Sequence, residues 1–525
     1  MALCTTLLAA GLGLAPVAPQ SNDLTIRWDY GLLGWTWQVG LTGTPGEGYV
    51  IVPSFESGPT PLALVDPFNT NSLAVGFDLP KAVRFGFLGS DGKAEVLYDL
   101  PDSPVLVGFD LRAQALPFPG VGTLFGTPSN VTSTRLTRLG DDVPTQGQPL
   151  QPRNRHAQVL LPDGRVLLFG GGAPGGQAAL EVELYDPQAQ AFVPTGAVLP
   201  EGIIRPEAEV LPNGDVLIVG GVGFDGQPRP TSWVFRSASG VLDRVTPLQD
   251  GRVMHTLEVL PDGRVIAIGG TKSYTLGHPL GLPGSLEAGP ILASTEIFDP
   301  QSGSWSPGPS LPAPRAAHAS SQTAPGVILV SGGIGPSPLG TVAHNDVWMG
   351  GGITGWSVAG DMLQARAFHG QVQTVSGELL VTGGAVVNQG NLSVIGGGEM
   401  FDPLVGASTQ GPLGLGIVMP DGREVCIPAP KVPPGEGEDP RDIFDTPPLT
   451  PPIVYYSGGG FIQTSDKNGQ FAPATGAART LAATTPWQSM TNGVEVGLGH
   501  RVTPIDEGLR LLFVGGQGAR ILTVQ

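Results

Sequence analysis

A short segment recurs along the chain at near-constant spacing, and this repetition limits the possible folds more than any other feature. In the first clear copy, His156 precedes the glycine pair Gly170-Gly171 by 14 positions. A sixth copy has Pro206 in the histidine position, and a seventh, Ile417 to Cys426, keeps the Pro-Asp-Gly turn and lacks the glycine pair. Such repeats indicate units that bury their apolar faces by stacking on one another. The other histidines of the repeat are His255, His318 and His369, each 14 positions before a pair, and His500, 15 positions before one.

Each copy predicts two strands joined by a tight turn. The dipeptide Asp163-Gly164 is typical of a hairpin, because glycine tolerates the positive φ that the turn needs. The apolar run Val166 to Phe169 predicts a strand buried on both faces. A second half follows, in which Tyr185-Asp186-Pro187 precedes Phe192. We therefore expect each unit to be a four-stranded meander of about 50 residues.

The combined pattern resembles kelch repeats, in particular the bacterial kelch and galactose-oxidase-like group. Paired glycines follow an apolar strand, Tyr/Phe-Asp-Pro and an aromatic residue come next, and an arginine stands three residues before the repeat histidine. The resemblance covers about residues 131–525 and implies a β-propeller with one blade per repeat. Seven copies of the first half imply seven blades; six is the alternative, because the copies between 411 and 475 are degenerate. The last blade needs a fourth strand, which Thr132 to Arg138 would supply unless the N-terminal region uses it.

Residues 21–130 form a separate unit of the expected all-β chain. Short runs such as Val83 to Phe87 and Ala94 to Tyr98 alternate apolar with polar or small residues, which predicts half-buried strands. We expect a small antiparallel β-sandwich ahead of the propeller. Three tryptophans are assigned to its core or rim, with a carbohydrate-stacking platform as the alternative: Trp28, Trp35 and Trp37.

The first 20 residues predict a signal peptide. Leu3 to Ala18 is apolar and rich in small residues, although the first cation is Arg27 and no basic start precedes the apolar run. An apolar N-terminal strand is the alternative. No other stretch reaches the roughly 20 apolar residues of a membrane helix. We therefore expect an exported protein, secreted, periplasmic or at the cell surface, with no membrane insertion beyond the leader.

Charge and cysteine content exclude several classes of function. The chain has 27 Lys and Arg residues against 45 Asp and Glu residues, a net charge of −18. This balance argues against nucleic acid as a partner, because nucleic acid selects a basic surface. The only cysteines are Cys4, in the expected leader, and Cys426, expected to be a small buried residue. A zinc site built from several cysteines is thereby excluded.

The arginines near the repeat histidines have two interpretations. In one, arginines and histidines tie neighbouring blades together by hydrogen bonds. In the other, the arginines form a ring at the channel mouth that binds an anionic ligand such as an acidic sugar. No metal is expected, because one histidine per blade leaves the imidazole groups too far apart to share one metal ion. The candidate ligand-binding arginines are Arg153, Arg205, Arg252, Arg315 and Arg366.

Three long insertions are expected on the same face as these arginines. They span Thr271 to Leu292, Ala385 to Gly397 and Ala429 to Pro452. Long loops on one side of a rigid scaffold usually carry a binding site. The further candidates on them are Tyr274, His278 and Lys431.

These features favour an exported, non-enzymatic protein that binds protein or glycan through one propeller face, with no cofactor. The alternative implied by the resemblance is a sugar-active enzyme, either like a copper radical oxidase or like a sugar epimerase. No Tyr and His set is recognisable as copper ligands, and the Gly-x-Ser-x-Gly and His-Glu-x-x-His motifs do not occur.

Overall fold

The chain divides into two compact units: unit 1 comprises Met1–Leu139 and Pro187–Gln190, and unit 2 comprises Gly140–Asp186 and Ala191–Gln525. Among the residues described below, no helix is long and apolar enough to cross a membrane. The computed structural model describes residues 24–28, 33–34, 36–118, 123–137, 142–145, 147–173, 176–187, 189–274, 291–338, 340–351, 354–373, 378–388, 391–394, 398–410, 424–427, 453–462, 470–480, 488–489, 501–505, 510–515 and 518–523.

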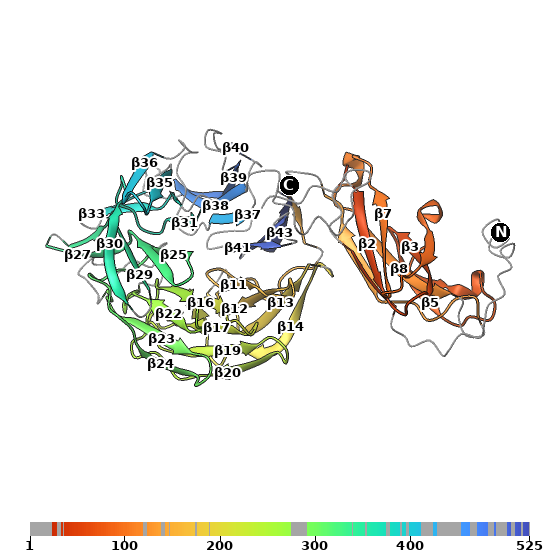
Figure 1. Cartoon of the computed structure of the whole chain (residues 1–525), viewed down its shortest axis with the longest axis horizontal. Coiled ribbons are helices and arrows are strands. Elements are labelled where there is room, and N and C mark those ends of the chain that lie inside the picture. The colour runs from red at the N-terminus through yellow and green to blue at the C-terminus, as the bar shows by residue number, and fades with distance from the viewer. Residues whose placement is uncertain are drawn as a thin grey trace. The chain divides into compact units, whose positions relative to one another are not determined.

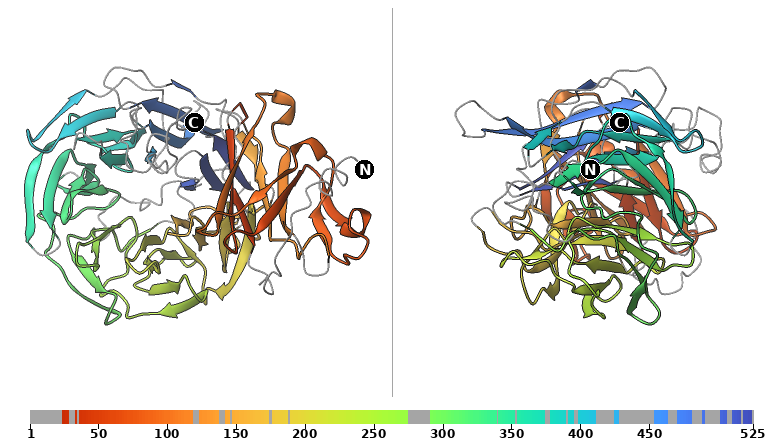
Figure 2. Two further views of the ribbon diagram at one scale, coloured as in Figure 1. Left: turned by 45° about the vertical axis from the view of Figure 1, so that its right-hand side comes forward. Right: turned by 90° about the vertical axis from the view of Figure 1, so that its left-hand side faces the viewer.

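Unit 1 is built from antiparallel sheets, red to orange in Figure 2. Three short 3-10 helices, η1 (Leu62–Leu64), η2 (Pro80–Ala82) and η3 (Pro104–Leu106), lie between strands. One sheet has the order β1 (Thr25–Trp28), β2 (Thr36–Thr42), β7 (Lys93–Asp99); a second has β6 (Arg84–Phe87), β3 (Gly48–Ser54), β8 (Asp110–Phe118), β9 (Val131–Arg135); β4 (Ser57–Pro61) pairs with β5 (Ser72–Val75).

The first two sheets share one core. Trp37 and Val39 of β2 pack in the same apolar cluster as Tyr49 and Ile51 of β3, because alternate residues of a strand face the same side. Trp37 is 2% exposed, and its ring lies 5.5 Å from that of Tyr98. The structure therefore assigns Trp37 to the core, whereas the side chains of Trp28 and Trp35 lie outside the description.

Unit 2 consists of four-stranded antiparallel sheets that follow one another along the chain. Each is named below by its first strand; the β25 and β31 sheets join at one parallel pair, Asp361 with Ala407, into an eight-stranded sheet. The strands are β11 (Ala157–Leu160), β12 (Val166–Phe169), β13 (Glu181–Asp186), β14 (Ala191–Val198); β16 (Glu207–Val210), β17 (Val216–Val219), β19 (Ser232–Arg236), β20 (Val241–Arg244); β21 (Thr256–Val259), β22 (Val265–Ile268), β23 (Thr295–Asp299), β24 (Ser304–Pro307); β25 (Ala319–Ala324), β26 (Val327–Ser331), β29 (Asp346–Gly351), β30 (Gly355–Asp361); β31 (Gly370–Gln373), β32 (Leu379–Thr382), β35 (Gly398–Asp402), β36 (Ala407–Gln410); β37 (Glu424–Ile427), β38 (Ile453–Ile462), β39 (Gln470–Thr480), β40 (Gln488–Ser489).

The last sheet joins the two ends of unit 2. Its order is β41 (Arg501–Ile505), β42 (Arg510–Gly515), β43 (Gly518–Thr523) and then β10 (Asp142–Pro144), with Val143 opposite Ile521. The expectation that Thr132 to Arg138 supplies this fourth strand is wrong, and its alternative, that the N-terminal region uses this segment, is confirmed. Most of that segment is β9, which pairs with β8 of unit 1, so unit 1 extends past residue 130 to Leu139.

Successive sheets contact one another through their first strands, which lie around the middle of unit 2 in Figure 1. Strand β11 lies beside β16, β16 beside β21, β21 beside β25, and β25 beside β31. The succession continues from β31 to β37 and from β37 to β41, and β41 lies beside β11. The second strands are the most buried; β12, β17 and β22 are buried at every position, as their apolar runs predict.

In the described part of the repeats, four glycine pairs connect one sheet to the next. Gly269 and Gly270 have φ of 58° and 99°, and the amide of Gly270 donates to the carbonyl oxygen of Arg315 at 2.7 Å. A Cβ on Gly269 would lie 2.5 Å from that oxygen, so both the backbone angle and the contact require glycine. The amides of Gly171, Gly221 and Gly333 donate in the same way to Ile203, Arg252 and Arg366.

Candidate functional site

The chain enters five successive sheets of unit 2 through a short segment, here called the lead-in segment. In the β21 sheet it runs from Arg252 to His255, and the corresponding segments are 153–156, 203–206, 315–318 and 366–369. The residue after the arginine position pairs with the residue that follows the glycine pair; Val253 pairs with Thr271, for example, and Ala367 with Ala385. The lead-in segments and the starts of two predicted insertions therefore lie at the same end of their sheets.

Four of the candidate arginines are buried and bound within their own sheets. Arg252 donates to the carbonyl oxygen of Gly269 at 2.9 Å and pairs with the Glu296 carboxylate. Arg366 donates to Gly383 at 2.8 Å and pairs with Glu399 at 2.7 Å. Burial lowers the pKa of Arg252, and the adjacent carboxylate opposes that shift. Arg153 pairs with Glu183 and Arg315 with Asp346; the exposed fraction of all four arginines is 3% or less.

This arrangement gives the four arginines a structural role. A guanidinium that has no exposed surface and already holds a carboxylate is not placed to bind an anion from solvent. Of the two interpretations of the arginines, the ring at a channel mouth is therefore the less favoured, because each of these four guanidinium groups forms a buried ion pair inside one sheet. Three of the carboxylate partners were visible in the sequence as the glutamate two positions before the aromatic residue of the Tyr/Phe-Asp-Pro motif, whereas Asp346 lies outside that motif.

Two histidines of the repeat form hydrogen bonds with the preceding sheet. The Nε2 atom of His318 lies 3.1 Å from the Thr256 hydroxyl of β21, and that of His369 lies 2.8 Å from the Ser331 hydroxyl of β26. Burial lowers the pKa of His318 to about 3, and it also holds the pKa of His255 and His369 well below the usual range. The imidazoles of His318 and His369 are therefore neutral links between sheets. His156 lies 3.1 Å from Gln158 of its own sheet, and His500 lies outside the described residues.

Arg205 occupies a different position from the other candidates. It stands two residues after the arginine position, where Ile203 is found, and its backbone φ is 53°. The same left-handed backbone recurs at this position in five lead-in segments, and these residues are called the left-handed positions. They are Arg155, Arg205, Met254, Ala317 and Phe368, with φ between 53° and 59°.

Backbone hydrogen bonds connect the left-handed positions of neighbouring sheets. The amide of Arg205 donates to the carbonyl oxygen of Arg155 at 2.6 Å, that of Ala317 to Met254 at 2.9 Å, and that of Phe368 to Ala317 at 2.8 Å. Non-glycine residues rarely adopt positive φ, so five occurrences at one position show that the backbone conformation belongs to the repeat and not to any one residue type. Their side chains differ in chemistry, and sequence reasoning had not singled out Arg155.

The surroundings of the left-handed positions are partly apolar and partly cationic. Met254 and Ala317 belong to an apolar cluster that also contains Tyr274 and Ile334. The hydroxyl oxygen of Tyr274 accepts a hydrogen bond from Nε of Arg205 at 3.2 Å, so these two sequence candidates are brought together. Tyr274 is 7% exposed. The candidates His278 and Lys431 lie outside the described residues.

Hairpins follow the glycine pairs at this end of the sheets. The pair β27 (Ile334–Ser337) and β28 (Gly340–Ala343) lies next to the pair β33 (Ala385–Asn388) and β34 (Asn391–Val394), with β28 beside β33. A shorter pair joins β15 (Ile203–Ile204) to β18 (Val222–Gly223). The insertion at 385–397 is thus largely a hairpin, whereas 275–290 and 428–452 are outside the description.

Polar side chains of the first strands bond to one another across sheet boundaries. Gln158 donates to the Thr503 hydroxyl at 2.7 Å, and the Ser320 hydroxyl donates to the Glu258 carboxylate at 2.6 Å. Burial raises the pKa of Glu258. Within the described residues, no group of three or more His, Cys, Asp or Glu side chains is placed to hold a metal ion. Cys426 lies in β37, and its side chain is not described.

Comparison with known proteins adds a likeness in fold only. No family model matches the chain, and no curated protein matches it in sequence. A solved structure described as "Structure of YjhT" aligns with a TM-score of 0.45 and 12% sequence identity. The alignment covers 65% of this chain and 99% of that one. At this identity and TM-score the likeness carries no argument about function.

Proposed function

We propose that this chain is a non-enzymatic binding protein that engages protein or glycan through the end of unit 2 where the lead-in segments and the hairpins meet. The observation that carries the proposal is the set of left-handed positions. Their backbone is constant, and Arg155, Arg205 and Phe368 are partly exposed on it, while Met254 and Ala317 are buried. A rigid backbone that presents unlike side chains is suited to recognition.

We further propose that unit 2 is a kelch-type propeller of seven blades. The cyclic order of first strands from β11 to β41 and back to β11 supports this. So does the pairing of β10 with β43, which lets the two ends of the unit complete one sheet. A ring of sheets leaves no open edge to aggregate, and it places corresponding loops on one face.

The left-handed positions also suggest the chemistry of the ligand. Arg155 and Arg205 are neighbours through the bond from the Arg205 amide to the Arg155 carbonyl oxygen, and Tyr274 lies beside Arg205. Guanidinium groups next to a tyrosine suit a carboxylate-bearing ligand such as an acidic sugar or an acidic peptide. We place this contact at Arg155 and Arg205, because the other candidate arginines are buried.

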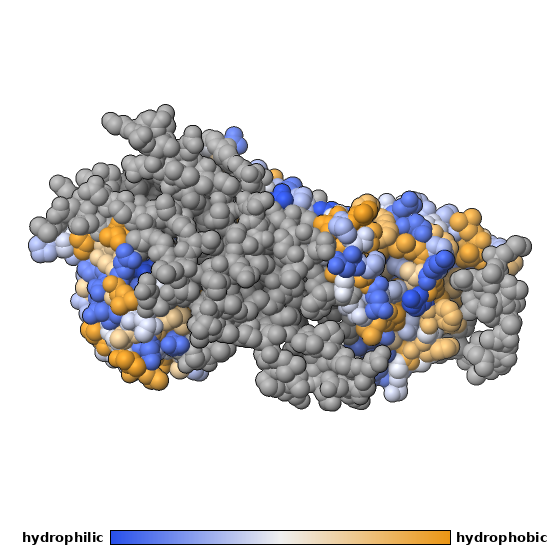
Figure 3. All heavy atoms as spheres, turned by 90° about the horizontal axis from the view of Figure 1, so that it is seen from above, coloured by the Kyte–Doolittle hydropathy of each residue, from blue (hydrophilic) through white to orange (hydrophobic). Residues whose placement is uncertain are grey.

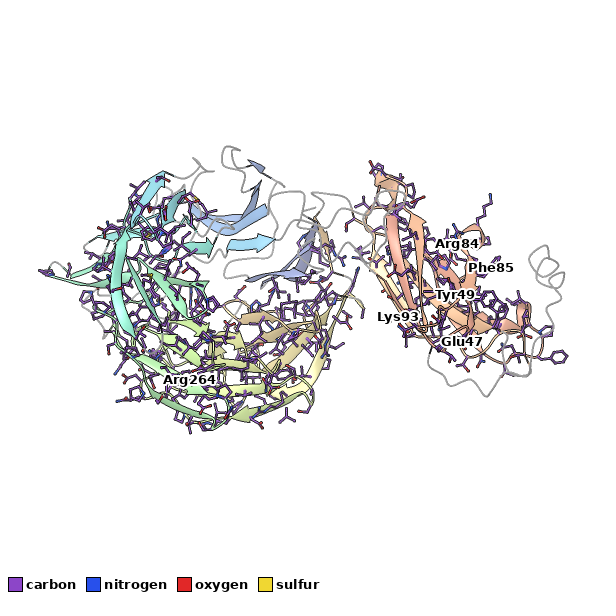
Figure 4. The ribbon with its side chains drawn as sticks, in the orientation of Figure 1. Glu47, Tyr49, Arg84, Phe85, Lys93 and Arg264 are labelled. Atoms are coloured by element: carbon purple, nitrogen blue, oxygen red, sulfur yellow. The ribbon has the colours of Figure 1, made fainter. Side chains whose placement is uncertain are left out.

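The test compares substitutions at opposite ends of the sheets. Arg155→Ser and Arg205→Ser are expected to abolish binding to ligands that a glycan array and a pull-down identify for the wild-type chain. The matched control is Arg264→Ser; Arg264, labelled in Figure 4, lies in the turn between β21 and β22, at the other end of its sheet. Binding that survives both substitutions, or that Arg264→Ser removes equally, contradicts the site.

The proposal extends to export and to the absence of catalysis, and each part has its own test. Amino-terminal sequencing of the protein recovered from outside the cytoplasm is expected to find cleavage near residue 20. Stoichiometric copper in the purified protein, peroxide production from sugars, or sugar epimerisation would replace the binding proposal by the enzymatic alternative.

A further inference from the structure

One edge of unit 1 brings together two tyrosines and an arginine from three strands. Tyr98 lies on β7, Arg84 on β6 and Tyr49 on β3. Strands β6 and β7 are each the edge strand of their sheet, and the two sheets pack face to face on one core. Gly86 of β6 pairs with Tyr49, and alternate residues of a strand face the same side, so Arg84 shares the core-facing side with Tyr49. Figure 4 labels both residues.

The guanidinium group of Arg84 lies over the Tyr98 ring. Its Cζ atom is 5.2 Å from the ring centroid. Its Nη1 atom donates to the carbonyl oxygen of Lys81 at 3.1 Å and to that of Val83 at 3.3 Å. These contacts hold the guanidinium beside the tyrosine, while the N–H groups on Nε and Nη2 can donate to a further acceptor.

The hydroxyl of Tyr98 is a buried donor that has no hydrogen-bond partner among the described residues. Tyr98 is 7% exposed. Burial raises the pKa of Tyr98, Arg84 opposes this shift and Tyr49 adds to it, so the phenol keeps its proton at neutral pH. Buried hydroxyls almost always have a partner, because an unpaired one costs free energy. An unused O–H beside a guanidinium therefore points to a ligand that supplies acceptor oxygens.

Gly86 makes room for the second hydroxyl. A Cβ on Gly86 would lie 2.6 Å from the Tyr49 hydroxyl oxygen and 2.9 Å from Cζ of that ring. Gly86 does not have positive φ, so the contact with Tyr49, and not the backbone angle, favours glycine here. The Tyr49 side chain thus extends across β6, the edge strand. Figure 3 shows hydrophilic and hydrophobic residues side by side on unit 1, and on β6 the exposed Phe85 follows Arg84 in the same way.

We propose that Tyr98, Tyr49 and Arg84 form a binding site for a carboxylate group, separate from the contact proposed in unit 2. All three side chains offer donors, and a carboxylate is an acceptor with no donor of its own. Arginine binds the two carboxylate oxygens through paired N–H groups. One guanidinium balances one negative charge, which favours a carboxylate over a doubly charged phosphate. Acidic sugars and acidic peptides both carry this group.

The experiment is isothermal titration calorimetry on the full chain carrying Arg155→Ser and Arg205→Ser, so that the contact proposed in unit 2 does not contribute. The probes are glucuronate, glucose as its neutral match, an acetylated and amidated glutamate, and inorganic phosphate. We expect glucuronate or the glutamate probe to bind, and glucose not to bind. Tyr98→Phe is expected to weaken this binding by at least about tenfold, and Arg84→Met to abolish it, because each removes a bond to a charged acceptor.

The matched control is Lys93→Met, which also removes one positive charge. Lys93, labelled in Figure 4, lies five positions before Tyr98 on β7 and therefore faces the other side of the sheet. Its replacement is expected to leave the affinity unchanged. An unchanged melting temperature in Tyr98→Phe shows that the loss of affinity is not a loss of folding.

The relative affinity of the two carboxylate probes identifies the source of the group as a sugar or a peptide. The proposal is overturned if no carboxylate binds, if phosphate binds more tightly than either, if Tyr98→Phe leaves the affinity intact, or if Lys93→Met lowers it as far as Arg84→Met. None of these results bears on Arg155 and Arg205, since both are already replaced.

Discussion

The β16 sheet and its neighbours in unit 2 have the same arrangement of strands. They differ in the residues that occupy the two positions of the buried Arg–Glu ion pair. In the β11, β21 and β31 sheets, an arginine pairs with a glutamate of the third strand. In the β16 sheet the two positions hold Ile203 and Trp233, both buried in an apolar cluster. The register is equivalent, since Trp233 faces Ile218 as Glu296 faces Ala267 in the β21 sheet. Pro206 also replaces the histidine.

The difference teaches which parts of the repeat the fold requires. The β16 sheet lacks the ion pair and the histidine, yet it keeps four strands, the glycine pair and the left-handed position at Arg205. The glycine pair and the left-handed backbone therefore connect the sheets. The interior of a sheet can be filled either by an Arg–Glu ion pair or by an apolar pair such as Ile203 and Trp233. The β25 sheet is intermediate: Arg315 remains, but it stacks 4.3 Å from the Trp348 ring and pairs with Asp346 instead.

Breaking the ion pair by removing one partner is expected to have the largest effect. Arg366→Met leaves the Glu399 carboxylate buried and unpaired, which is expected to lower the free energy of unfolding of unit 2 by about 3–5 kcal/mol. The double variant Arg366→Met, Glu399→Met imitates the apolar β16 sheet and is expected to recover most of that loss. Urea denaturation of the three proteins measures both. A double variant no more stable than the single one would show that an apolar pair cannot replace the ion pair at these two positions.

Replacement of the first glycine of a pair is expected to cost the same in both kinds of sheet. A Cβ would lie 2.5 Å from the Arg252 carbonyl oxygen in Gly220→Ala and 2.4 Å from that of Arg366 in Gly332→Ala. With the positive φ added, each is expected to destabilise unit 2 by about 2–4 kcal/mol. The control Gly164→Ala has positive φ but nothing within 4 Å of the new Cβ, and about 1 kcal/mol is expected. Thermal unfolding compares them; a cost confined to Gly332 would contradict the shared role.

Acidification is expected to distinguish the sheets that carry a histidine. The pKa of His318 is about 3 in the folded chain against an ordinary 6.5, so its neutral form is favoured by folding. The associated stability is complete above pH 6.5 and is lost as pH falls from 6.5 toward 3, because the unfolded chain takes up the proton first. At pH 5 the loss is about 2 kcal/mol for this residue. His318→Gln is expected to show a correspondingly shallower fall in denaturation midpoint between pH 7 and 5; parallel curves would contradict the assignment.

The exposed ion pairs are expected to contribute least. Arg264 and Asp262 lie 2.7 Å apart across a turn, and both side chains are accessible to solvent. Arg264→Ala is expected to change the free energy of unfolding by less than about 0.5 kcal/mol, because water and salt screen the pair. A chemical denaturation curve that moves as far as that of Arg366→Met would show that burial is not what separates the two classes of pair.

The repeat pattern was sufficient to predict much of unit 2. The apolar run Val166 to Phe169 predicted a strand buried on both faces, Asp163-Gly164 predicted the turn before it, and the structure confirms both. These features are local, since strand periodicity and turn chemistry depend on neighbouring residues in the chain. The left-handed positions were not predictable in this way, because Arg155, Met254 and Phe368 have no shared residue type.

The sequence by itself determined the strand and turn pattern and the glycine pairs, because each follows from backbone geometry within a few residues. In unit 1 the predicted alternation holds for Ala94 to Tyr98 but is wrong for Val83 to Phe87, where Phe85 and Phe87 are exposed. Only the tertiary structure decided that Arg153 and Arg366 are buried against carboxylates, that β10 rather than the segment after Thr132 completes the last sheet, and that Phe68 stands exposed. Whether a charged group is exposed to solvent or paired with a buried partner depends on residues that are distant in the sequence. A pattern of neighbouring residues does not indicate which distant residues pack together.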